Sequence, residues 1–376
     1  MQFGLSDDEE ALRESVAGFV SAQCPLATTR QLLDGPLGYD PAVWRRAGNE
    51  LGLAAMIIPE SYGGFGASPV AAGVVLRELG RGLTPLPYLS SAVLATTALL
   101  ALADDEHQGD LLPSLAAAER LATIAIIDED RPALAIATSA AGRSGVAVSG
   151  TKVSVLDAEA ADVILVVADS GAGPALYAVD RGSPGMRIER ENSLDLTRRQ
   201  FRVSFNETPG RPLGPAASAS GLARLVDVAC TALAIDQVGV AEAALHMAVD
   251  YAKVREQFAR PIGSFQAVKH LCAEMLLQTE RASAAAFYAL WVAESEPDEL
   301  AIASRVAKST CSDAAVAVTS ANVQIHGGIG YTWEHDAHLY YRRARGAALM
   351  FGSPESHRSA LYERLTSAAP QEDPWG

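Results

Sequence analysis

Two motifs in the C-terminal half of the chain contain residue types that bind phosphate-bearing ligands. The first runs from Arg255 to Ser264 and reads REQFARPIGS, and the second runs from Gln324 to Tyr331 and reads QIHGGIGY. An arginine guanidinium can donate two parallel hydrogen bonds to a pyrophosphate. Adjacent glycines let a backbone approach a dinucleotide closely and present N–H groups to it. Taken separately, the two motifs are also open to plainer interpretations, as a surface charge and a helix-ending turn.

The two motifs together resemble the C-terminal signatures of the acyl-CoA dehydrogenase flavoprotein family. The loop from Pro59 to Gly66, PESYGGFG, also matches the PE-x-Y-GG-x-G loop of that family. The resemblance implies an FAD cofactor and an acyl-CoA substrate. In the family, two helices of one subunit contact the adenosine diphosphate end of the FAD that a neighbouring subunit holds. By position, the residues implied in this contact are Arg255, Gln257, Phe258, Gln324, Gly327 and Gly328.

The catalytic base of that family is missing from the sequence. The family's glutamate would fall at position 351, which is Phe351, and the alternative position used by isovaleryl-type members is Ala229. The family reaction removes a proton from the carbon next to a thioester while hydride leaves the following carbon, so a carboxylate must contact the substrate. Gly352, Ser353 and Arg358 match the family pattern around the missing glutamate. We therefore expect the absence to be real and not an error of alignment.

Two other carboxylates are weaker candidates for a base. Glu355 lies four residues after Phe351, which is one turn away if that segment is helical. Asp227 lies two residues before Ala229, hence about 200° around a helix and on the wrong face. Their alternative roles are a solvated helix face for Glu355 and a capped or buried polar group for Asp227.

The half of the family's site that holds the flavin ring is also altered. The segment Gly150–Lys152 keeps the lead-in to a Trp-Ile-Thr-Asn strand, yet Ser154 stands where the tryptophan would stack and Leu156 replaces a hydroxyl donor. The family's Thr-Glu-Pro-Gly-x-Gly-Ser-Asp loop is replaced by a segment that contains Asp128 and Asp130. These carboxylates would place negative charge close to a flavin that becomes anionic on reduction, which opposes its reduction.

Changes in hydrophobic periodicity divide the chain into three parts. Ser6 is predicted to cap a first helix, and apolar residues then recur at spacings of three and four up to about position 118. Apolar stretches that resume at Leu222–Val254 predict long buried helices. Between the two helical parts, five short runs favour strands: Thr123–Ile127, Val146–Ser149, Val163–Val167, Ala175–Val179 and Phe201–Phe205. The prediction is an α+β multidomain protein with an N-terminal helical domain (1–118), a middle β-domain (119–215) and a C-terminal four-helix-bundle domain (216–376), which is the acyl-CoA dehydrogenase fold.

Composition limits the classes of partner and compartment. The net charge of −15 argues against a nucleic-acid or anionic-membrane surface. Four cysteines without CxxC spacing are expected to be reduced and buried, and His326 is expected to pack and not to bind metal. An N-terminus that turns acidic at once shows no leader pattern, and no apolar run approaches about 18 residues. These features predict a cytoplasmic protein without a membrane span.

Three functions remain open from the sequence. The first is the subunit without a catalytic base in a heterotetrameric acyl-CoA dehydrogenase. The substrates that the resemblance suggests for such an enzyme are bulky acyl-CoA thioesters such as those of steroid side chains. This chain would lend its nucleotide-binding residues to the FAD of a second subunit, with an electron-transferring flavoprotein as acceptor. The second is a homotetrameric dehydrogenase of acyl-CoA or acyl carrier protein that uses Glu355. The third is an acyl-CoA-binding scaffold without catalytic activity.

Overall fold

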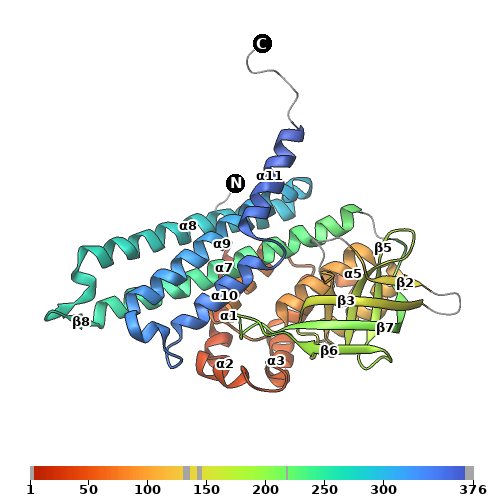
Figure 1. Cartoon of the computed structure of the whole chain (residues 1–376), viewed down its shortest axis with the longest axis horizontal. Helices are drawn as coiled ribbons and strands as arrows, with labels where there is room; N and C mark the ends of the chain where they lie inside the picture. Colours follow the sequence, from red (N-terminus) through yellow and green to blue (C-terminus); the bar gives the residue numbers. More distant parts are fainter. Residues whose placement is uncertain (1–3, 130–135, 142–145, 217–218, 369–376) are drawn as a thin grey trace, which may run out of the picture.

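The computed structural model describes residues 4–129, 136–141, 146–216 and 219–368 (Figure 1). In Figure 1 the β-sheet lies at one end of the molecule, and the long C-terminal helices extend from it to the other end. Helices also form the N-terminal part, so the predicted fold class is confirmed.

The N-terminal part is helical, as its periodicity predicts. The predicted cap is confirmed, because the Glu9 N–H donates to Ser6 Oγ at 3.3 Å and the Ser6 N–H donates to Glu9 Oε2 at 2.8 Å. The loop from Pro59 to Gly66 has a structural role, since a Cβ at Gly64 would lie 2.0 Å from the Ile58 carbonyl oxygen. The helices are α1 (Asp7–Gln23), α2 (Leu26–Leu32), α3 (Pro41–Leu51), η1 (Leu53–Ala55), η2 (Glu60–Tyr62), α4 (Pro69–Arg81), the π-helix η3 (Tyr88–Ala95), α5 (Thr96–Leu102) and α6 (Asp105–Ala116).

The middle part is a seven-stranded sheet that closes on itself. Its path runs β1-β4-β2-β3-β7-β5, and β5 also pairs with β4, so β4, β2, β3, β7 and β5 form a closed ring to which β1 is added at β4. Strand β6 pairs with β7. All five predicted strands are present, and β2 and β6 add to them. The strands are β1 (Ala122–Ala125), β2 (Ser139–Ala141), β3 (Val146–Leu156), β4 (Val163–Asp169), β5 (Pro174–Asp180), β6 (Met186–Arg190) and β7 (Gln200–Pro212).

Long antiparallel helices make up the C-terminal part. Helix α7 contacts α4 of the N-terminal part as well as α8, α9 and α10, so it lies at the centre of the molecule. A small hairpin connects α7 to α8 at the end that lies far from the sheet. The elements are α7 (Ala219–Val254), β8 (Glu256–Gln257), β9 (Arg260–Pro261), η4 (Ile262–Ser264), α8 (Gln266–Ser295), η5 (Pro297–Glu299), α9 (Leu300–His326), η6 (Gly327–Tyr331), α10 (Ala337–Leu349) and α11 (Pro354–Ala368).

Helix α7 is apolar around most of its circumference. Within the described residues it is the one helix, from Ser220 to Val254, that is long and apolar enough to cross a membrane by length and composition. Burial inside the protein covers 83% of its most apolar stretch. A buried core helix has the same composition, so this feature is weak evidence for a membrane span.

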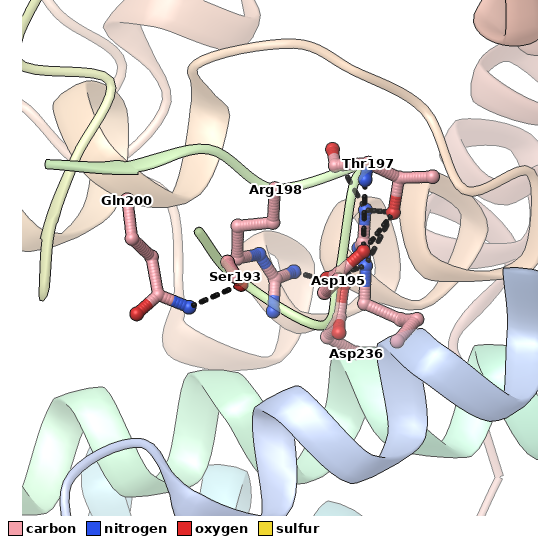
Figure 2. Close-up of polar contacts among 7 residues, drawn as sticks. Ser193, Asp195, Thr197, Arg198, Gln200 and Asp236 are labelled. Carbon is pink, nitrogen blue, oxygen red and sulfur yellow. Dashed lines mark hydrogen bonds and ion pairs between the residues drawn. The ribbon is translucent and has the colours of Figure 1, made fainter. Parts of the chain in front are cut away.

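A buried group of charged side chains joins the sheet to the C-terminal helices. Arg343 on α10 contacts Asp195 at 2.8 Å and Asp236 of α7 at 3.3 Å, and Arg198 donates to Asp236 at 2.8 Å. Figure 2 shows Asp195, Thr197 and Arg198 descending from the β6–β7 segment toward these helices. We call Asp195, Thr197, Arg198, Asp236 and Arg343 the charged network.

Candidate functional site

The first motif forms the β8–β9 hairpin and exposes its residues. Gln257 pairs with Arg260, so Phe258 and Ala259 are the two loop residues, with φ of 53° and 59°. A two-residue loop with positive φ at both positions normally takes asparagine or glycine, and other residues there are strained. The Phe258 side chain is 88% exposed, and its ring meets Phe265 edge-on at 6.1 Å. The hairpin therefore presents an apolar ring to the outside of the molecule.

The second motif ends helix α9. Gly327 is the C-cap with φ of 64°, so the conformation that ends the helix favours glycine. A Cβ at Gly327 or Gly328 would meet nothing within 4 Å, so both glycines face open space. The predicted packing role of His326 is confirmed: it is buried, its Nδ1 lies 2.8 Å from the Asn322 carbonyl oxygen, and its ring stacks on Tyr251. No cluster of three or more metal-ligating side chains occurs within the described ranges.

The two motifs meet at one surface cavity of about 480 Å³, which we call the hairpin cavity. Gln257 and Phe258 line it from the hairpin, and Gln324 lines it from α9. Arg255, Gly327 and Gly328 are outside its lining, although Arg255 directly precedes the hairpin and the glycines directly follow α9. The Arg255 side chain is exposed and has no ion pair within the described part of the chain. These residues are open to solvent on one side, so the hairpin cavity is accessible from outside the chain.

A second cavity of about 640 Å³ lies between the sheet and helices α9 to α11. We call it the Phe351 cavity, after the residue at the first position expected for the family's base. Phe351 has φ of 56° in the turn between α10 and α11, and it packs against the main hydrophobic core. Ala229, at the alternative position, is fully buried in α7. An apolar ring and a methyl group thus occupy both positions, and neither can accept a proton.

Glu355 lines the Phe351 cavity, but the segment from Phe351 to Glu355 is not helical throughout, so the one-turn spacing that a helix would give does not apply. Helix α11 begins at Pro354, so Phe351 lies in the preceding turn and not one turn away on the same helix. The Glu355 side chain is 76% exposed, with Arg358 at 3.5 Å. Its own backbone N–H, the Ser353 hydroxyl and the charge of Arg358 lower the pKa of Glu355. A solvated carboxylate with a lowered pKa is a poor general base.

Sequence reasoning missed a second carboxylate at this cavity, Asp313 of α9. It lines the Phe351 cavity and accepts from Arg358 Nη1 at 2.7 Å. One guanidinium therefore engages both Asp313 and Glu355. The sequence carried no signal for Asp313, because its distance from position 351 is set by helix packing.

Asp227 is excluded as a base by its surroundings. It is buried, and Oδ1 accepts from Ser304 Oγ and from Arg305 Nη1, each at 3.0 Å. It is absent from the lining of the Phe351 cavity. The predicted alternative role of a buried, capped polar group is confirmed.

The expectation that Asp128 places free negative charge at a flavin is wrong. Asp128 is buried and accepts from Lys152 Nζ at 2.8 Å, from the Ala137 N–H at 2.9 Å and from the Thr138 hydroxyl. Burial opposes its ionisation, but these hydrogen bonds outweigh burial and lower the pKa of Asp128. Its charge is therefore compensated inside the sheet. Asp130 lies outside the described residues.

One residue of strand β3, Ser154, reaches the Phe351 cavity. Ser154 has φ of 55° next to an irregularity in the pairing of β3 with β7, and it lines the cavity. Its backbone N–H donates to Glu191 Oε2 at 3.1 Å. Leu156 is buried and lies outside the cavity lining. A serine at position 154 offers no aromatic surface on which a ring could stack.

A buried lysine, also missed from the sequence, holds the Phe351 turn. Lys308 Nζ donates to Ser312 Oγ at 3.2 Å, to the Ala348 carbonyl at 3.1 Å and to the Gly352 carbonyl at 3.3 Å. Burial lowers the pKa of Lys308 to about 8. Its ligands are neutral oxygens, and no carboxylate pairs with it among the described residues. The signal in the sequence was one lysine in an otherwise apolar and small-residue stretch of α9.

The thiols are largely buried, as expected. Cys24, Cys230 and Cys311 are buried, all four cysteines are free, and Cys272 is partly exposed. Burial raises the pKa of Cys230 to about 12, and its sulfur lies 3.9 Å from His357 Nε2. Such thiols stay protonated and are not nucleophiles.

Comparisons with known proteins cover nearly the whole chain. The family model for the acyl-CoA dehydrogenase N-terminal domain matches residues 6–119, and that for the C-terminal domain matches residues 224–366. Acyl-CoA dehydrogenase IpdE2 of Mycolicibacterium smegmatis is 35% identical over 359 residues, which are 95% of this chain and 98% of that protein.

Two solved assemblies share the fold over nearly their full length. The ChsE4-ChsE5 complex from Mycobacterium tuberculosis contains a chain with 28% identity and a TM-score of 0.90, covering 98% of this chain and 100% of that one. A variant of the Tcur3481-Tcur3483 steroid ACAD contains a chain with 29% identity and a TM-score of 0.87, covering 96% of this chain and 98% of that one.

Proposed function

The chain belongs to the acyl-CoA dehydrogenase family, and on that premise we propose that it is the subunit without a catalytic base in a hetero-oligomeric acyl-CoA dehydrogenase. The family is FAD-dependent and dehydrogenates acyl-CoA thioesters. In this proposal a second family member supplies the base and the flavin-ring pocket. This chain supplies the residues of the hairpin cavity to the partner's cofactor.

One observation carries the proposal: this chain lacks the family's residues in one half of the site and keeps them in the other half. Phe351 and Ala229 occupy the two positions expected for the base. The carboxylates of Asp313 and Glu355, which line the Phe351 cavity, both form ion pairs with Arg358. The hairpin motif and the end of α9, by contrast, keep their polar and glycine residues and expose them. Loss confined to the half that would serve this chain's own cofactor is what a complementing subunit is expected to show.

The residues at the hairpin cavity fit the adenosine diphosphate end of FAD. In the proposed complex Arg255 binds a pyrophosphate oxygen through its guanidinium, and Gln257 and Gln324 supply amide donors. Phe258 covers an apolar face of the ligand, and the open backbone at Gly327 and Gly328 allows a close approach. FAD, when bound, would supply the hydride acceptor of the family reaction. This chain's contribution is to bind and orient the cofactor and not to move a proton.

The names of the related proteins support the partner and substrate parts of the proposal. One solved relative is described as a ChsE4-ChsE5 complex and another as a steroid ACAD of two named chains. By analogy we propose that this chain pairs with a second acyl-CoA dehydrogenase subunit and that the pair acts on a bulky acyl-CoA such as a steroid side-chain thioester. An electron-transferring flavoprotein in the cytoplasm is the acceptor that family membership suggests.

A second candidate is a homotetramer that uses Glu355 or Asp313 as a displaced base. The presence of both carboxylates in the lining of the Phe351 cavity favours it. Their shared ion pairs with Arg358 and the lowered pKa of Glu355 argue against it. We therefore rank it below the hetero-oligomeric subunit.

The experiment that separates the two is flavin stoichiometry. The chain is purified alone and after co-expression with each acyl-CoA dehydrogenase encoded nearby, and FAD is counted per chain from absorbance. The proposal expects a colourless chain alone and a stable mixed complex with less than one FAD per chain. A yellow protein with one FAD per chain and dehydrogenase activity without a partner would contradict it.

A further inference from the structure

A small polar cavity lies where the three parts of the chain meet, and we call it the junction cavity. Its volume is about 40 Å³. Thr84 and Tyr88 reach it from the N-terminal part, Arg198 and Arg199 from the segment just before β7, and Asp236 from α7. It adjoins the charged network, two of whose members, Arg198 and Asp236, face each other in Figure 2.

Unpaired polar atoms are concentrated around this cavity. In the described part of the chain, eleven buried side-chain nitrogen and oxygen atoms have no hydrogen-bond partner. Five of them belong to residues that line the junction cavity: Thr84 Oγ1, Tyr88 Oη, Arg198 Nη1, Arg199 Nε and Asp236 Oδ2. Each of these residues is less than one-tenth exposed. Because buried polar atoms in folded proteins are almost always hydrogen-bonded, this concentration indicates an occupant.

The unpaired atoms define what the occupant must do. The guanidinium nitrogens can only donate, so the occupant must accept hydrogen bonds. Asp236 Oδ2 can only accept while it is ionised, so the occupant must also donate. The surrounding charges are balanced, since three arginines and three aspartates gather there: Arg198, Arg199, Arg343, Asp157, Asp195 and Asp236. Because the charges are balanced, a neutral occupant is favoured. An anion would lie against the carboxylate of Asp236 and could not donate a hydrogen bond to it.

We infer that the junction cavity is a built site for ordered water, with Tyr88, Arg198 and Asp236 among its ligands. A volume of about 40 Å³ has room for about three water molecules. Water both donates and accepts, so it satisfies the guanidinium nitrogens and Asp236 Oδ2 together. A thioester or a flavin is far too large for this space, so the site is separate from the hairpin cavity and the Phe351 cavity.

The water has a specific structural consequence. Thr84 and Tyr88 have no side-chain hydrogen bond to the charged network within the described residues. Ordered water is therefore a polar connection from Thr84 and Tyr88 to the charged network, beside the direct hydrogen bonds that Arg199 donates to the Leu32, Leu33 and Pro36 carbonyls. The junction is held by hydrogen bonds through solvent as well as by apolar packing.

A pair of isosteric substitutions tests the inference by the sign of the effect. Thr84→Val removes a hydroxyl at the junction cavity, and Thr29→Val removes an equally unpaired buried hydroxyl that lies outside it. Valine cannot make the hydrogen bond that a threonine hydroxyl makes to water, so the substitution then lowers stability. Where the hydroxyl has no partner, the methyl group of valine removes an unpaired buried polar atom, and stability is unchanged or higher. With the full-length chain, or its complex, we expect Thr84→Val to lower Tm by roughly 2 °C and Thr29→Val to leave it unchanged or raise it. An increase in Tm for Thr84→Val would overturn the inference.

A crystal structure gives the direct test. Density peaks at about 2.7–3.2 Å from Tyr88 Oη, Arg198 Nη1 and Asp236 Oδ2 are the expected result. Crystals soaked in bromide should show no anomalous signal there, because a neutral ligand does not exchange with a halide. An empty cavity would overturn the inference, and so would an anomalous bromide peak in it, since an anion would then be the occupant. Neither outcome depends on whether the chain has a catalytic partner.

Discussion

The guanidinium of Arg343 lies 2.8 Å from the carboxylate of Asp195, and both side chains are 2% exposed. Asp195 lies in the segment before β7, and Arg343 lies on the helix that leads to the Phe351 turn. A Cβ at Gly346, one turn after Arg343, would lie 3.0 Å from Asp195 Cβ, so the backbones of the two segments lie close together. This ion pair therefore holds α10 close to the Ser193–Leu194 segment, and these two segments form one wall of the Phe351 cavity.

Arg343→Met should destabilise the chain strongly. The change leaves the buried carboxylate of Asp195 without a guanidinium and Asp236 with Arg198 alone, and breaking such a buried pair costs about 3–5 kcal/mol. Arg358→Met is the control, because that arginine is about half exposed and its ion pairs contribute about 0–1 kcal/mol. Urea denaturation of both variants measures the difference. Equal losses would show that the buried network does not hold the domains together.

Arg255→Ala should weaken FAD retention by the mixed complex and leave this chain folded. A charge-assisted hydrogen bond to phosphate contributes about 1.5–3 kcal/mol, so we expect at least about a tenfold rise in the Kd for FAD. Lys253→Ala is the matched control, since Lys253 is exposed two residues earlier and pairs only with Asp250 in the described structure. Flavin released on dilution measures retention. Unchanged retention in Arg255→Ala would remove this arginine from the cofactor site.

Neither Glu355→Gln nor Asp313→Asn should change the activity of the mixed complex by more than about twofold from that with the natural chain. Neither carboxylate is suited to proton abstraction, because both pair with Arg358. Loss of a general base typically costs 10²–10⁴-fold or more in rate. Steady-state assays of both variants with the acyl-CoA substrate measure the effect. A fall of that size in either variant would identify the displaced base and favour the homotetramer.

Lys308 should make stability depend on pH above neutrality. Burial lowers its pKa from the ordinary 10.5 to about 8, so between these values the unfolded chain holds a proton that the folded chain has lost. The free energy of unfolding therefore rises with pH in this window through this group. Relative to Lys308→Met, the natural chain should gain stability between pH 8 and 10. Urea denaturation at both pH values gives the difference, and a constant difference would mean that the buried amine does not titrate there.

Much of the fold followed from local patterns in the sequence. The helix cap at Ser6, the apolar length of α7 and the alternation of the five strands are confirmed because each depends on neighbours within a few residues. The packing role of His326 is confirmed for a similar reason, since its hydrogen bond runs to Asn322 on the same helix. The motifs also identified positions 351 and 229 as those expected for the family's base, and the sequence has no carboxylate at either.

Tertiary structure alone decided which charges meet. Asp128 with Lys152, Asp313 with Arg358, and Arg343 with Asp195 and Asp236 are pairs between separate elements, and no local spacing predicts them. The expectation about Asp128 failed because its partner Lys152 lies on β3, and the helical spacing considered for Glu355 does not occur because Phe351 lies in the turn before α11. Local hydrogen bonding and periodicity are encoded by near neighbours, whereas the charge and shape of a site depend on how distant segments pack.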